Sequence, residues 1–78
     1  MCLGLPAQVV EAREGDDLID VDMAGVVRKV NSALLDGPWD AGEWVLIHSG
    51  FVLERMSDEE AQDALALMNA FAAELDST

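Results

Sequence analysis

The hydrophobic pattern of this chain changes its period once, at residue 57, and that change limits the folds open to it. Before it, Ile19–Met23 alternates apolar and polar side chains, as a strand with one buried face does. After it, apolar residues recur at steps of three and four, which places them on one stripe of a helix; they are Ala61, Ala64, Leu65, Met68, Phe71, Ala72 and Leu75. Ser57 and Glu60 fit a capping box, which starts a helix. The sequence therefore predicts strands followed by one helix over residues 57–75.

Glycines and turn residues divide the part before residue 56 into short segments. Turn residues at Gly15–Asp17, an interruption at Gly25, a loop over residues 36–43 and a bend at Gly50 leave four or five strands. The most apolar of them begins at Trp44, which we expect in the core, whereas Trp39 in the loop is expected to be exposed.

Several short strands followed by one amphipathic helix favour a closed barrel, because an open sheet of this size leaves its edge strands unpaired. We therefore expect a mainly β fold, a small OB-like β-barrel with a C-terminal α-helix packed on one side. The chain, residues 1–78, is expected to be a single domain, with an N-terminal arm over residues 1–6 and the barrel over residues 7–55.

The charge of the chain excludes several classes of partner. Sixteen acidic residues against four basic ones give a formal net charge of -12, and the cations are scattered. Binding to nucleic acid or to an anionic membrane surface needs clustered Lys and Arg, so neither is expected. No stretch approaches the roughly 18 apolar residues of a membrane span. The single cysteine allows no internal disulfide and indicates the reducing cytoplasm.

Cys2 is that single cysteine, and it stands directly after Met1. An initiator methionine is normally removed before a small residue, so the mature chain is expected to begin at Cys2. The α-amine is then close to the thiol and favours its thiolate form. A thiolate on a mobile end of the chain is a soft ligand for iron or another thiophilic metal. The alternative is a buried and inert cysteine.

The residues around Cys2 indicate a short arm that contacts a partner. Gly4 tolerates unusual backbone dihedrals and Pro6 fixes its own φ, so together they give the arm a direction. Leu3 and Leu5 are apolar, and they either dock on a partner or pack against the barrel. Cys2, Leu3, Gly4, Leu5 and Pro6 are the candidate partner-binding residues of the arm.

His48, the only histidine, ends the apolar strand and is the second candidate ligand. A lone histidine is more often a hydrogen-bonded structural residue than a ligand, but His48 meets Cys2 if the first strand pairs near the last. One thiolate and one imidazole are too few for a structural zinc site, which takes four protein ligands. A Cys2–His48 pair also raises a thiol-enzyme hypothesis, with Asp40 or Glu43 orienting the imidazole.

Three segments resemble one family. Met1-Cys2-Leu3-Gly4-Leu5-Pro6, Ala24-Gly25-Val26-Val27-Arg28, and Gly42-Glu43-Trp44-Val45-Leu46-Ile47-His48-Ser49-Gly50-Phe51 together resemble the HypC/HupF/HybG family of [NiFe]-hydrogenase maturation chaperones. The resemblance implies an OB-like barrel without catalysis of its own. It also implies that Cys2 and His48 are the functional residues and that Cys2 binds iron and contacts both partners. Those partners are a HypD-type scaffold protein, with which the Fe(CN)2CO group is assembled, and the precursor of the hydrogenase large subunit, which receives it.

The leading hypothesis is thus a cytoplasmic metallochaperone that carries iron transiently as Fe(CN)2CO and has no permanently bound cofactor. The alternative is a structural adaptor in hydrogenase assembly that binds partners through Leu3, Leu5 and the helix without touching metal.

Overall fold

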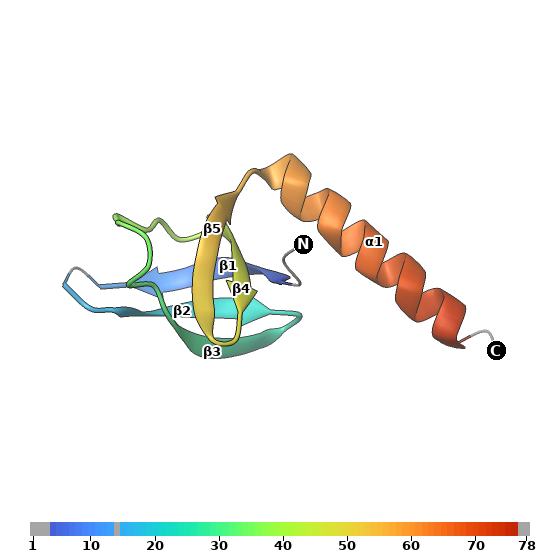
Figure 1. Cartoon of the computed structure of the whole chain (residues 1–78), viewed down its shortest axis with the longest axis horizontal. Coiled ribbons are helices and arrows are strands. Elements are labelled where there is room, and N and C mark those ends of the chain that lie inside the picture. The colour runs from blue at the N-terminus through green and yellow to red at the C-terminus, as the bar shows by residue number, and fades with distance from the viewer. Residues whose placement is uncertain (1–3, 14, 77–78) are drawn as a thin grey trace.

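The protein is a five-stranded barrel with one helix extending from it (Figure 1). The computed structural model describes residues 4–13 and 15–76. Its elements are β1 (Leu5–Ala12), β2 (Leu18–Met23), β3 (Val26–Asn31), β4 (Trp44–His48), β5 (Phe51–Met56) and α1 (Asp58–Asp76). The barrel closes in the order β1-β2-β3-β5-β4. The prediction of a mainly β, OB-like barrel with a C-terminal helix is confirmed.

The first strand begins earlier than the sequence indicates. We expected the arm to reach residue 6, but β1 starts at Leu5, so Leu5 and Pro6 are part of the barrel. Pro6 tolerates this position because a proline at the start of a strand removes few ladder hydrogen bonds.

The closure of the barrel depends on β1, which pairs with two strands in turn. Residues Leu5–Gln8 pair antiparallel with β4, and Gln8–Ala12 pair antiparallel with β2. The register with β2 shifts between Val9 and Glu11. A bulge of this kind bends a strand and increases its twist. The bend lets one strand leave one side of the barrel and continue into the other.

Two tight turns join neighbouring strands. Ala24–Gly25 joins β2 to β3, with φ of 54° and 87°, and Ser49–Gly50 joins β4 to β5, with φ of 53° and 81°. Positive φ at both central residues is the feature of a type I′ turn, whose twist matches that of the flanking strands. The interruptions predicted at Gly25 and Gly50 are therefore two-residue hairpins.

The core is built from small and β-branched side chains on the inner faces of the strands. It consists of Ala7, Val9, Ile19, Val21, Val30, Val45, Ile47 and Val52. Trp44, which we expected in the core, is only half-buried and does not belong to it, so that expectation was wrong. Trp39, expected to be exposed, is half-buried and packs against this core.

Arg55 fixes the loop that carries Trp39. Its guanidinium donates to the carbonyl oxygens of Asp36 and Pro38 at 2.8 and 3.0 Å and forms an ion pair with Glu43. The Arg55 Cζ also lies 4.0 Å from the centroid of the Trp39 ring, as in a cation–π contact. One side chain of β5 thus holds residues 36–43 against the barrel.

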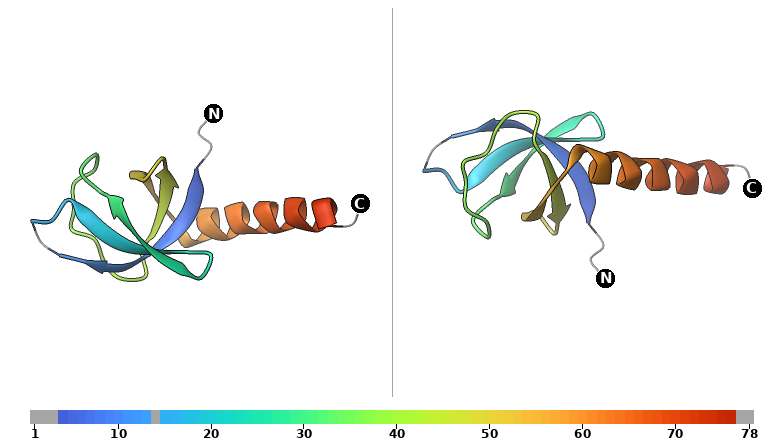
Figure 2. Two further views of the ribbon diagram at one scale, coloured as in Figure 1. Left: turned by 90° about the horizontal axis from the view of Figure 1, so that it is seen from below. Right: turned by 90° about the horizontal axis from the view of Figure 1, so that it is seen from above.

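The helix does not pack along the barrel, so that expectation was wrong. Figures 1 and 2 show α1 projecting from the barrel with only its first turns beside the strands. Ala61 is buried, whereas Leu67 and Met68 are 63% and 41% exposed. The whole molecule measures 47 × 21 × 21 Å. Within residues 4–13 and 15–76, no helix is both long and apolar enough to cross a membrane.

Gly4 lies against β4 with no room for a side chain. A Cβ added to it stands 2.6 Å from Leu46 Cγ and 3.1 Å from the carbonyl oxygen of Ile47. The missing side chain therefore allows the start of the described chain to approach β4 closely.

We expect Gly4→Ala to lower the free energy of unfolding by about 1–3 kcal/mol, the usual cost of overpacking. Denaturant unfolding of four proteins measures it: the parent, Gly4→Ala, Leu46→Ala and the double variant. Because Leu46→Ala removes the nearest obstructing atoms, Gly4→Ala should cost less in that background. Equal costs in both backgrounds would show that Leu46 does not require the glycine.

The helix begins with the predicted capping box. The Glu60 backbone N–H donates to Ser57 Oγ at 3.1 Å, and the Ser57 N–H donates to Glu60 Oε1 at 3.0 Å. The hydrogen bond from the Ser57 backbone, followed by the one involving its side chain, lowers the pKa of Glu60. Because the pKa of the Glu60 carboxyl is lowered, the cap contributes its full stabilisation of the folded state when the pH is above the ordinary glutamate pKa. This stabilisation is lost as the pH falls through the lowered pKa.

We expect Ser57→Ala to raise the pKa of Glu60 toward its ordinary value and to reduce helix content at neutral pH. Carbon-detected NMR titration of the Glu60 carboxyl measures the first effect, and circular dichroism measures the second. Because the Ser57 backbone N–H remains in the variant, the rise is partial, and a pKa unchanged by the substitution would show that the Ser57 hydroxyl plays no part in lowering it.

Candidate functional site

The pairing of β1 with β4 brings the start of the described chain to the far end of β4. Leu5 pairs with Ile47 and Pro6 with Leu46. Continued by one residue, this antiparallel register sets Gly4 opposite His48. The first strand thus lies beside the strand that ends in His48.

Cys2 and Leu3 lie outside the described residues, so their predicted roles stay predictions. In the sequence, Cys2 stands two residues before Gly4, the first described residue.

His48 is an exposed residue at the end of β4 and pairs with Phe51 across the Ser49–Gly50 turn. Phe51 is 40% exposed, so an aromatic ring and an imidazole stand on neighbouring strands at this end. The turn holds both in place because its two left-handed residues fix the direction in which the strands leave it. Whether His48 binds metal stays a prediction.

The candidate partner-binding residues of the arm differ in exposure. Leu5 is 47% exposed and is available to a partner. Gly4 is half-buried against Leu46, and Pro6 is buried in the barrel. Gly4 and Pro6 thus fix the position and direction of the chain leading to Cys2.

The acidic residues suggested as orienting groups for His48 lie elsewhere. Glu43 comes immediately before β4 and pairs with Arg55, while the Asp40 backbone N–H donates to Glu43 Oε2 at 3.2 Å. His48 is at the other end of this five-residue strand, roughly 17 Å away at the usual rise. Neither acid orients the imidazole, so this part of the thiol-enzyme hypothesis is wrong.

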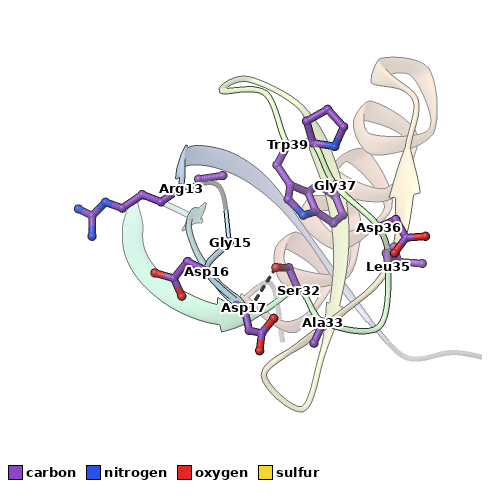
Figure 3. A pocket seen from close by; sticks show the side chains of 12 residues that line it. Arg13, Gly15, Asp16, Asp17, Ser32, Ala33, Leu35, Asp36, Gly37 and Trp39 are labelled. Carbon is purple, nitrogen blue, oxygen red and sulfur yellow. Dashed lines mark hydrogen bonds between the residues drawn. The ribbon is translucent and has the colours of Figure 1, made fainter.

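A hollow at the opposite end of the barrel contains none of the predicted site residues (Figure 3). It lies between the loop after β1 and the loop after β3, beside Asp16, Asp17, Asp36 and Trp39. The Ser32 hydroxyl donates to the Asp17 carbonyl oxygen at 3.1 Å, which ties the two loops together. Among the described residues, no group of three or more His, Cys, Asp or Glu side chains is arranged to hold a metal ion.

Two residues that shape the site were not singled out from the sequence. Phe51 follows His48-Ser49-Gly50 at the spacing of a two-residue hairpin, and that spacing identifies it as the partner of His48. Leu46, against which Gly4 packs, carries no such signal, because the contact depends on the register between distant strands.

Known proteins resemble this chain along most of its length. The HupF/HypC family model matches residues 1–68. Hydrogenase maturation factor HybG of Escherichia coli (strain K12) is 40% identical over 76 residues, covering 88% of this chain and 93% of that protein. Hydrogenase maturation factor HypC of the same strain is 37% identical over 82 residues, covering 97% and 89%. HypC of Helicobacter hepaticus is 37% identical over 67 residues, covering 86% and 77%. The chain therefore belongs to the HupF/HypC family.

Proposed function

We propose that this protein is a cytoplasmic hydrogenase maturation chaperone that carries an iron group and performs no catalysis of its own. It receives Fe(CN)2CO on a HypD-type scaffold protein and delivers it to the precursor of the [NiFe]-hydrogenase large subunit. The observation that carries the proposal is the β1–β4 register, which brings the start of the described chain, two residues after Cys2 in the sequence, to the end of the barrel that presents His48. The relatives named hydrogenase maturation factors support the class of function.

The ligand inventory of the chain suits a carrier better than a permanent metal site. The sequence contains one cysteine and one histidine. A thiolate is a strong, soft ligand for iron, but a stable protein cage needs more donors. With Cys2 as one ligand and His48 as the candidate second one, the iron keeps positions for its diatomic ligands and for donors from a partner. Cysteines of the receiving protein then displace Cys2 by ligand exchange.

The barrel gives this ligand a defined place without enclosing it. Gly4 packs on Leu46 and Pro6 is buried, so the arm leaves the barrel at a fixed point. Leu5 and Phe51, both partly exposed, flank that point with apolar surface. Such a surface fits docking onto a partner that completes the coordination of the iron.

The adaptor alternative draws on the same exposed Leu5 and on the projecting helix, neither of which needs a metal. The two functions differ in what they require of Cys2. A carrier needs the sulfur atom, whereas an adaptor needs only a folded barrel and its apolar contacts.

We expect Cys2→Ala and Cys2→Ser to abolish hydrogenase maturation while leaving the fold unchanged by circular dichroism. Complexes purified without oxygen with the scaffold protein should show cyanide and carbon monoxide stretches in the infrared, and the Cys2 variants should lose them. Normal maturation with Cys2→Ser, together with complexes free of iron, would establish the adaptor instead.

We expect Leu5→Ala to weaken binding to the scaffold protein by about three- to tenfold, because truncating a half-exposed apolar contact removes roughly 1 kcal/mol of burial. Leu34→Ala, on a residue 61% exposed in the loop after β3, is the matched control and should leave affinity unchanged. Isothermal titration calorimetry measures both. Equal affinities of the parent and Leu5→Ala would remove Leu5 from the interface.

A further inference from the structure

One edge of β3 is left without a neighbouring strand over most of its length. Its other edge pairs with β2 at all six positions, from Val26 opposite Met23 to Asn31 opposite Leu18. Toward β5, the ladder is a single parallel pair, Asn31 with Phe51. Among the described residues, no strand therefore covers this edge from Val26 to Val30.

The turn geometry shows which backbone groups face the open edge. In a two-residue hairpin with positive φ at Ala24 and Gly25, the residues that flank the turn are hydrogen-bonded to each other. Backbone groups alternate sides along a strand, so Val26, Arg28 and Val30 face β2. Val27 and Lys29 face outward. The Asn31 N–H, two positions further on, agrees with this alternation, since it donates to the Gly50 carbonyl at 2.8 Å.

A hollow of about 560 Å³ adjoins this edge. Residues 27–30 of β3 and Met23 form one wall, and Leu5, Ile47 and the Ser49–Gly50 turn form the other. Figure 2 shows the β2–β3 hairpin and the start of β1 at the same end of the barrel. Val26 and Val27, at this edge, are 51% and 59% exposed. An open strand edge with exposed β-branched side chains is a template for pairing with another strand.

The charge around the hollow opposes that of the rest of the protein. Of its described lining residues none is acidic, although the chain has 16 Asp and Glu, and two are cations. Lys29 is paired with Asp20 at 3.0 Å. Arg13 and Arg55 also have carboxylate partners. Within the described part of the chain, Arg28 makes neither an ion pair nor a side-chain hydrogen bond.

From these observations we propose that the open edge of β3 binds an extended, acidic segment of a partner protein by β-strand addition. Backbone groups of the segment pair with Val27 and Lys29, its apolar side chains enter the hollow, and a carboxylate meets Arg28. The Ala24–Arg28 segment, to which the proposed iron chemistry assigns no part, thereby acquires a role. The surface does not depend on Cys2 or on a metal.

A second copy of this chain is a poor occupant of the edge. Two copies, each with a net charge of -12, repel each other at long range far more strongly than one copy repels a short segment with a single carboxylate. An antiparallel pairing of two β3 edges centred on Arg28 would also set two guanidinium groups directly opposite each other, which is destabilising. The complementary occupant is therefore an acidic strand from another protein.

The test uses the full chain and the peptide acetyl-Ser-Val-Thr-Glu-Thr-Val-Ser-amide, which places glutamate opposite Arg28 and a valine two positions away on each side. Titration followed by NMR should shift the amides of Val26–Val30 and of Ser49–Gly50. Hydrogen exchange at Val27 and Lys29 should slow. Replacing the peptide's glutamate by glutamine, or Arg28 by glutamine in the protein, should weaken binding about two- to fivefold, as for a partly exposed ion pair. Arg13→Gln, at the opposite end of the barrel, is the control and should change nothing.

Backbone pairing has its own matched test. In an added strand only alternate residues direct their N–H toward β3. N-methylation of both threonines and N-methylation of the glutamate should therefore have opposite outcomes, one abolishing binding and the other sparing it. The proposal would be overturned if the two N-methylated peptides bound equally well, or if the Val26–Val30 amides did not shift at millimolar peptide. It would also be overturned by shifts confined to α1 or another surface, or by dimers of the free protein in light scattering.

Discussion

The fold depends on one strand taking part in both sides of the barrel. β1 pairs with β4 at its start and with β2 at its end, and the bulge between Val9 and Glu11 makes the change of direction possible. The same pairing fixes where the chain begins relative to His48, because Leu5 lies opposite Ile47. Gly4 is part of this constraint, since a side chain there would meet Leu46. Closure of the core and the position of Gly4 near His48 are thus consequences of a single register.

The sequence predicts the features that depend on local chemistry. Alternation in β2, the glycines of the two hairpins and the Ser57–Glu60 cap identify strands, turns and helix start close to where they are found. Features that depend on distant residues were missed. Trp39 was predicted to be an exposed loop residue, because no residue near it in the sequence indicates that Arg55 contacts its ring. The apolar stripe of α1 indicates that one face of the helix favours burial, but it does not identify the surface that would cover this face. For the site, both candidate ligands could be named from their residue types, but the β1–β4 register that brings the start of the described chain beside His48 could not.

Acidic and basic side chains are unevenly distributed over the molecule. Cations serve as local ties in an otherwise acidic chain: Arg55 holds the loop before β4, and Lys29 joins β3 to β2 through Asp20. The helix contributes acidic residues and has no basic residue in its last turn. Against this background the described lining of the hollow near Leu5, Arg28 and the Ser49–Gly50 turn contains two cations and no acidic residue. A partner approaching this end meets little of the repulsion that an acidic surface would meet elsewhere.

The projecting helix also affects how the protein behaves in solution. A compact chain of this length has an expected radius of gyration of about 11.5 Å, whereas the Cα atoms here give 13.1 Å. A rod attached to a ball experiences more friction than a sphere of equal mass. The monomer will therefore elute early from a size-exclusion column calibrated with compact standards and imitate a larger species there. Sedimentation equilibrium, which responds to buoyant mass and is independent of shape, reports the true stoichiometry of its complexes.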